Sequence, residues 1–126
     1  MKIKGNDVLN YTFSLKNILN KDMPGKLALA VVNNVKLLED KETALRMAIQ
    51  KTRQKYAKKD DNGEYVVEKD RYVYTPEGET ECNAELTELG EQEIEVAEFM
   101  KVDISLFEKC NDISPADILA LQFMTK

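Results

Sequence analysis

Residues 24–59 carry an apolar stripe with the spacing of an amphipathic helix, and this stripe constrains the fold more than any other feature of the sequence. Two series of positions, three residues apart and each repeating every seven residues, carry it over about four heptads. One series contains Val31, Leu38 and Leu45, and the other contains Val35 and Ile49. A helix of about 35 residues is about 50 Å long, which exceeds the diameter of a folded domain of 126 residues. We therefore expect the helix either to protrude or to be covered along its length by other elements.

Glu42 interrupts the apolar stripe at its centre. In the simpler interpretation, the apolar seam drifts at this level onto Ala44 and Ala48. In the second interpretation, Glu42 makes a polar contact that sets the specificity of helix packing.

Shorter helical and strand-like patterns fill the rest of the chain. In chain order we expect a strand-like segment over 1–6, a helix over 7–20, the long helix over 24–59, a hairpin over 64–75, a helix over 79–90, two strands over 94–96 and 102–106, and a helix from 115 to the end. This order predicts an α+β fold, with a long amphipathic helix, short helices and two small antiparallel strand pairs. The length suits a single domain over residues 1–126.

The last helix has the most specific start signal in the chain. Ser114 is a good N-cap residue, Pro115 suits the first helical position, and Asp117 stands where a capping box needs an acidic side chain. We expect the helix to begin at Pro115.

The charges are segregated along the chain. Six lysines and arginines and no acidic residue lie between Thr43 and Lys59, whereas nine glutamates and no basic residue lie between Tyr72 and Met100. In one interpretation, the acidic 79–90 helix folds back antiparallel beside the basic end of the long helix, next to Arg46, Arg53 and Lys55. In the other, the glutamates form an external acidic surface that imitates the phosphates of a nucleic acid.

The acidic segment and the polar position within the apolar stripe supply the candidate partner-binding residues. All of them are glutamates, and all but one lie in the acidic segment. They are Glu77, Glu79, Glu81, Glu85, Glu88, Glu91 and Glu42.

The composition excludes several kinds of catalytic site. The chain contains no histidine, which removes the commonest metal ligand, the commonest general base and every triad built on imidazole. The five glycines are isolated from one another, so no phosphate-binding loop is present. We expect no enzyme activity, no cofactor and no metal ion.

Charge and cysteine content indicate the compartment. The net charge of −5 argues against generic nucleic-acid binding. Two cysteines, Cys82 and Cys110, do not make a disulfide framework, so we expect reduced thiols in a cytosolic protein. We find neither an apolar run of membrane-spanning length nor the apolar region of a signal peptide, and we expect no membrane partner.

The layout of the chain resembles a group of small phage and prophage proteins of unknown function from Gram-positive bacteria. The resemblance lies in Met23-Pro24 before the long helix, the stretch over 55–63 that ends it, the segment over 85–89, the alternating residues over 94–104, and the terminal helix that opens at 113–117. It implies a phage gene product without enzyme activity, and it brings no active-site residues.

Two functions follow as hypotheses. The first is a non-enzymatic phage or prophage interaction protein in the host cytoplasm that binds another protein, either a second copy in a homodimer, a phage protein or a host protein. It would act as an assembly factor or as a modulator of a host protein, because an apolar stripe longer than its own domain tends to be covered by a partner. The alternative is an acidic counter-defence inhibitor that mimics nucleic acid against a host nuclease. An enzyme with a carboxylate-bound metal is a third, weaker hypothesis.

Overall fold

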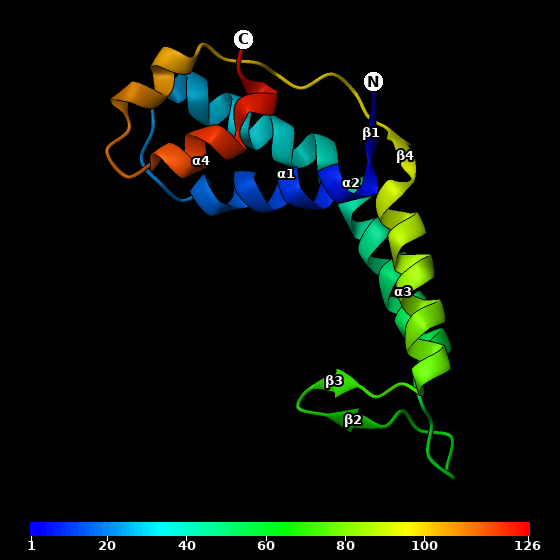
Figure 1. Cartoon of the computed structure of the whole chain (residues 1–126). Helices are drawn as coiled ribbons and strands as arrows, with labels where there is room; N and C mark the ends of the chain where they lie inside the picture. Colours follow the sequence, from blue (N-terminus) through cyan, green and yellow to red (C-terminus); the bar gives the residue numbers. More distant parts are fainter.

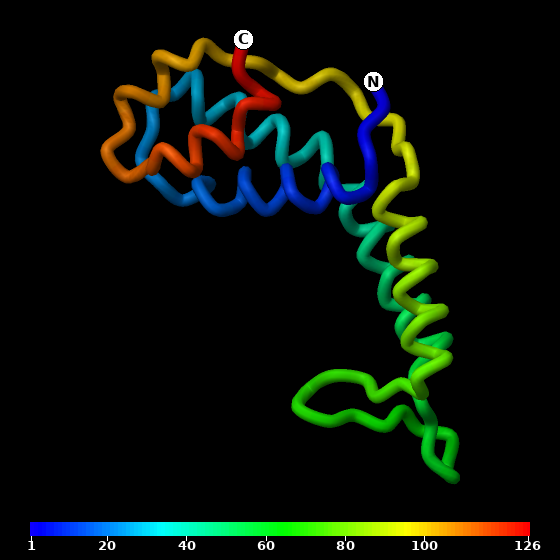
Figure 2. The backbone as a smooth tube through the Cα atoms, viewed as in Figure 1, coloured from blue at the N-terminus to red at the C-terminus, as the bar shows by residue number.

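The long helix α2 (Gly25–Tyr56) divides the protein into two parts, as the computed structural model of residues 1–126 shows (Figure 1). Its first half packs against α1 (Gly5–Ile18) in a head that also holds the C-terminal segment. Its second half leaves the head beside α3 (Pro76–Glu91), and a hairpin lies at the far end of this pair (Figure 2). We call residues 42–91 the arm and the rest of the chain the head. The long helix therefore both protrudes and is covered along its length by its own chain.

The remaining elements are short. They are β1 (Lys2–Lys4), β2 (Val67–Glu68), β3 (Arg71–Tyr72), β4 (Glu93–Glu95), the 3₁₀ helix η1 (Ile104–Lys109), α4 (Pro115–Ala120) and the 3₁₀ helix η2 (Gln122–Met124). Strand β1 pairs antiparallel with β4, and β2 pairs antiparallel with β3. The expected α+β fold, with its long helix and two small antiparallel strand pairs, is confirmed.

Two strands were expected, over 94–96 and 102–106, and the second of them is wrong. Strand β4 pairs with β1, in a register that places Ile3 opposite Ile94, and residues 104–109 form η1 instead of a strand. The Asp103 side chain accepts a hydrogen bond from the backbone N–H of Ser105, at 3.0 Å, and so caps the 3₁₀ helix. The turn buries Phe107 and leaves Ile104 exposed, whereas an alternating strand would place Val102 and Ile104 on the same face.

The hydrophobic core lies entirely in the head. Thirteen buried residues form it, and they come from α1, the first half of α2 and the chain after β4. Tyr11 and Phe123 stack beside this cluster with ring centroids 4.0 Å apart. The buried Asn34 side chain makes two hydrogen bonds to the backbone of Met100. Its Nδ2 donates to the Met100 carbonyl at 3.0 Å, and its Oδ1 accepts from the Met100 N–H at 2.8 Å. These bonds attach the extended segment after β4 to α2.

The apolar seam of α2 runs from the head into the arm. Val31, Leu38 and Leu45 are buried, and Ile49 is half-buried. The interpretation in which the seam drifts onto Ala44 and Ala48 is wrong at Ala44, which is exposed, whereas Ala48 is half-buried.

Glu42 instead makes the polar contact of the second interpretation, and the contact is within the chain. Glu42 is buried, and its Oε1 lies 3.3 Å from Lys16 Nζ and 3.6 Å from Arg46 Nε. Both cations extend from the surface over the carboxylate, so its charge is compensated where the arm begins.

Two glycines allow the arm to join the head closely. A Cβ atom at Gly5 would collide with the backbone carbonyl of Leu89, and a Cβ atom at Gly90 would collide with the side chain of Asn6. The backbone N–H of Gly5 donates to the carbonyl of Gln92 at 2.9 Å. The start of α1 and the end of α3 are therefore in direct contact.

Candidate functional site

The arm is a two-helix structure with a thin apolar seam. Leu45 and Cys82 are its buried apolar side chains, while Ile49, Leu86 and Leu89 are half-buried. A pair of helices covers each partner on one side only, so the other sides of both helices remain in solvent. The arm is therefore the part of the molecule with the largest share of open helical surface.

An ion pair joins the two helices of the arm. Lys55 Nζ lies 2.8 Å from Glu85 Oε1, and the Tyr56 hydroxyl donates to the same oxygen at 2.6 Å. The ammonium of Lys55, followed by the hydroxyl of Tyr56, holds the pKa of Glu85 below its ordinary value. The expected antiparallel packing of the acidic helix against the basic end of α2 is confirmed, with its ion pair at Lys55.

The other two basic residues expected beside the acidic helix make no ion pair with it. Arg46 pairs with Glu42 on its own helix, and Arg53 has no ion-pair partner within 4.0 Å. Lys51, on the same half of α2, is also exposed and without an ion-pair partner. Most of the basic charge on α2 is consequently available to solvent.

The structure divides the seven candidate glutamates into three groups. Glu85 and Glu42 turn toward basic side chains of their own chain. Glu79 lines a cavity at the tip of the arm. The other four share the outward side of α3, because their spacing of four, seven and three residues returns to one face of a helix. This outer acidic row consists of Glu77, Glu81, Glu88 and Glu91.

The outer acidic row is exposed along its whole length. Glu91, at its head end, pairs with Lys4 of β1 at 2.7 Å. The other three members make no ion pair within 4.0 Å. The interpretation that acidic side chains form an external surface therefore applies to the four members of this row, three of which make no ion pair.

Tyr72 joins the hairpin at the tip to α2 through its hydroxyl group. The hydroxyl of Tyr72 accepts hydrogen bonds from Gln50 Nε2 at 3.0 Å and from Gln54 Nε2 at 3.2 Å. Lys69 and Asp70 connect the strands with positive φ angles of 51° and 64°, the backbone of a tight hairpin turn whose twist matches that of its strands.

A cavity with a volume of about 930 Å³ lies between the hairpin, α2 and α3. Its lining consists of Gln50, Arg53, Val67, Asp70, Arg71, Tyr72, Tyr74 and Glu79. Two arginines and two carboxylates meet there, so the cavity has no excess of either charge. Of these residues, only Glu79 is among the sequence candidates. Tyr72 and Tyr74 are two residues apart in a strand-like run, so both lie on one face. This spacing was the sequence signal that could have pointed to the lining of the cavity.

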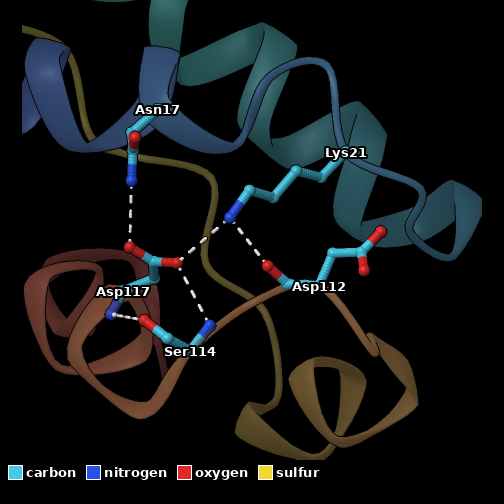
Figure 3. A network of polar contacts seen from close by, with 5 residues as sticks. All are labelled: Asn17, Lys21, Asp112, Ser114 and Asp117. Atoms are coloured by element: carbon cyan, nitrogen blue, oxygen red, sulfur yellow. Dashed lines mark hydrogen bonds and ion pairs between the residues drawn. The ribbon is translucent and has the colours of Figure 1, made fainter.

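A second polar network holds the head together (Figure 3). Lys21 Nζ donates to the carbonyl of Asp112 at 2.7 Å and lies 3.4 Å from Asp117 Oδ2, while Asn17 donates to the other oxygen of Asp117 at 2.9 Å. Asp117 and Ser114 form the expected capping box at the start of α4. The backbone N–H of Ser114, and after it the ammonium of Lys21, hold the pKa of Asp117 below its ordinary value. This network attaches α4 to α1 and is structural.

No group of three or more cysteine and carboxylate side chains is placed to hold a metal ion. Both cysteines are free thiols, with Cys82 buried and Cys110 half-buried. None of the helices combines the length and the apolar character that crossing a membrane requires.

Comparisons with protein-family models, with curated proteins and with solved structures find no match to the chain.

Proposed function

We propose that this chain is a non-enzymatic interaction protein that binds another protein through its arm. The observation that carries the proposal is the arm itself. It extends from the head that contains the core (Figure 1), and it exposes charged rows of opposite sign on its two helices.

The reason for a partner differs in part from the one the apolar stripe suggested. The stripe of α2 is covered by α1 in the head, whereas in the arm α3 covers it less completely and Ile49 stays half-buried. The surfaces that remain open are the outer sides of the two arm helices, where Met47 is 59% exposed on α2 and the outer acidic row lies on α3. A binding role rests on these outer sides.

The layout that resembles small phage and prophage proteins supports a phage origin within this proposal. The role would then be an assembly factor or a modulator of a host protein in the host cytoplasm.

A nucleic-acid mimic is the second candidate, and the outer acidic row favours it. A step of four residues along a helix is about 6 Å, close to the spacing of about 6–7 Å between phosphates of one strand. The step from Glu77 to Glu81 has this length, but the following steps to Glu88 and Glu91 are about 10 Å and about 4–5 Å. Glu85, which would fill the gap, is paired with Lys55. The row thus fits a run of phosphates less well than it fits a protein surface with spaced cations.

The experiment compares capture of partners by two charge-reversal variants of the full chain. The arm variant carries Glu81→Lys with Glu88→Lys. The matched control carries Glu98→Lys with Glu108→Lys in the head, where both side chains are exposed and make no ion pair. We expect a protein captured from phage-infected or host lysate by the wild type to be lost with the arm variant and retained with the control.

Equal capture by both variants would contradict a role for the arm. Release of the captured protein by duplex DNA of random sequence, with no effect of a neutral polymer, would support the mimic in place of the first candidate.

A further inference from the structure

The arm is less completely packed than the head. Its two helices bury Leu45 and Cys82, and Ile49, Leu86 and Leu89 are only half-buried. Antiparallel helices reach full coverage of such seams when four of them surround one core. Two further helices beside the arm would supply that coverage.

One face of the arm carries a row of alanines and lysines on α2 and a row of glutamates on α3. Ala44, Ala48, Lys51 and Lys55 follow one another at steps of four, three and four residues, so they share one side of α2. Lys55 contacts Glu85 across the seam. This contact shows which side of α3 turns to the same face.

On α3, Glu81 and Glu88 flank Glu85 at four residues before it and three residues after it. Both are exposed and make no ion pair within the chain. We call the surface made by these residues the paired face. It consists of Ala44, Ala48, Lys51 and Lys55 on α2, and Glu81, Glu85 and Glu88 on α3.

We propose that the paired face binds the paired face of a second copy of this chain, with each α3 lying against α2 of the other copy. This inference rests on the proposed function, because it names the protein that the arm binds. A surface that meets itself about a two-fold axis must be complementary to itself, and the paired face is, because one of its edges is basic and the other acidic.

The register follows from the ion pair within the arm. Lys55 is level with Glu85, and the two helices are antiparallel, so Lys51 is level with the turn that contains Glu88. A two-fold axis along the arm keeps these levels and places Lys51 of one copy opposite Glu88 of the other. The four helices then alternate between basic and acidic around the bundle. The arrangement with α3 against α3 would bring the glutamates of both copies together, and like charges across an interface are unfavourable.

The alanines determine how closely the copies approach. Ala44 is exposed and Ala48 is half-buried, and neither extends beyond its Cβ. The partner's helix can therefore come close enough to cover the half-exposed seam.

The experiment measures self-association of the full chain by sedimentation equilibrium at low and high salt, with three arm variants. We expect the wild type to dimerise, with weaker association at high salt because the pairs are screened. Lys51→Glu and Glu88→Lys should each raise the dimer dissociation constant about tenfold, because each reversal affects two symmetric contacts. The double variant Lys51→Glu with Glu88→Lys should recover association, since the exchanged charges again face each other.

Matched controls and a folding readout separate the possible outcomes. Lys101→Glu and Glu108→Lys change the same charges on exposed head residues without ion pairs and should leave the dissociation constant unchanged, and circular dichroism checks that every variant keeps its helices. A wild type that stays monomeric at all concentrations, or a double variant that associates no better than the singles, overturns the inference. A monomer that still captures a different protein through Glu81 and Glu88 overturns the inference while leaving the proposed function in place.

Discussion

The head and the arm share one helix but differ in how many neighbours that helix has. In the head, α2 is packed against α1 and the chain after β4, and thirteen buried residues form one core. In the arm, α2 has α3 as its neighbour, and the buried apolar side chains are Leu45 and Cys82. The same apolar periodicity therefore gives a fully packed core in one half and a half-open seam in the other. A repeat of apolar residues specifies which side of a helix is covered, and the number of neighbouring elements decides how completely that side is buried.

This comparison predicts how the stability of the two parts differs. The core of the head supplies most of the hydrophobic stabilisation, and the arm depends on its root at the head and on a few polar contacts.

Truncation of the seam should cost more in the head than in the arm. Leu38→Ala should lower the free energy of unfolding by an amount near the upper end of the range of about 2–5 kcal/mol for buried leucines, because its site is enclosed. Leu45→Ala should fall near the lower end, because the root of the arm is closer to solvent. Urea melts of both variants measure the difference, and equal effects would mean that the arm is packed as tightly as the head.

A methyl group added where the head and the arm meet should also lower the free energy of unfolding. Gly5→Ala should destabilise by about 1–3 kcal/mol, because the added methyl group meets the backbone carbonyl of Leu89, which has no side-chain freedom to move aside. Gly25→Ala is the matched control, since nothing lies within 4 Å of a Cβ atom there. Thermal melts should show a lower midpoint for Gly5→Ala only. A midpoint unchanged by Gly5→Ala would mean that α1 and α3 do not meet closely.

Loss of the cap on α4 should have an effect of middle size within the head. Ser114→Ala removes the hydroxyl that accepts from the backbone N–H of Asp117 at 3.2 Å. We expect a loss of about 1 kcal/mol, measured by urea denaturation. Ser114→Gly should lose only a few tenths of this amount, and a larger loss for glycine than for alanine would argue against the cap.

The same network should make the stability of the head depend on pH. The pKa of Asp117 in the folded protein lies below its ordinary value, so its contribution is fully present above the pKa of the unfolded chain and is lost as the pH falls through the folded-state pKa. We expect Asp117→Asn to reduce the loss of stability between neutral pH and a pH of about 3. Asp112→Asn is the control, because the side chain of Asp112 takes no part in the network (Figure 3). Urea midpoints of the wild type and of Asp117→Asn at several pH values measure this effect. We expect the two profiles to converge at low pH, and parallel profiles would contradict the prediction.

The smallest effect should come from a single exposed charge near the tip of the arm. Lys58 is exposed and makes no ion pair, so Lys58→Glu should change the free energy of unfolding by well under about 1 kcal/mol. A urea melt beside that of Leu45→Ala measures both. If the two effects were equally small, Leu45 would belong to a binding surface and not to the seam.

Local sequence signals predicted the helices of this protein well. The apolar repeat located α2, and the Ser114–Asp117 pattern located the start of α4, because both depend on residues within a few positions of one another. The start of α3 at Pro76 was missed, although Thr75 caps it by accepting from the N–H of Gly78. Thr75-Pro76 is the same kind of signal as Ser114-Pro115.

The candidate site was predictable as a charged segment and not as a surface. The sequence located the run of glutamates, and helical spacing groups four of them on one side of α3. It did not indicate that Glu85 turns to Lys55 or that Glu42 contacts Lys16, because these contacts join residues 30 and 26 positions apart in the chain. The pair of Glu42 with Arg46 is an (i, i+4) contact on one helix, which helical spacing could have indicated. Nor did it indicate the cavity at the tip, which three separate elements line.

By itself, the sequence determined the local periodicities, and with them the helices, the α+β class and the segregation of charge. Only the tertiary structure decided that β1 pairs with β4, that Phe107 is buried in a 3₁₀ turn, and that the second half of α2 leaves the head beside α3. The physical reason is the distance along the chain over which each preference acts. Helix periodicity and capping act between residues about one turn apart, whereas the pairing of Lys2 with Glu95 joins strands that lie far apart in the sequence and is selected by the packing of the whole molecule.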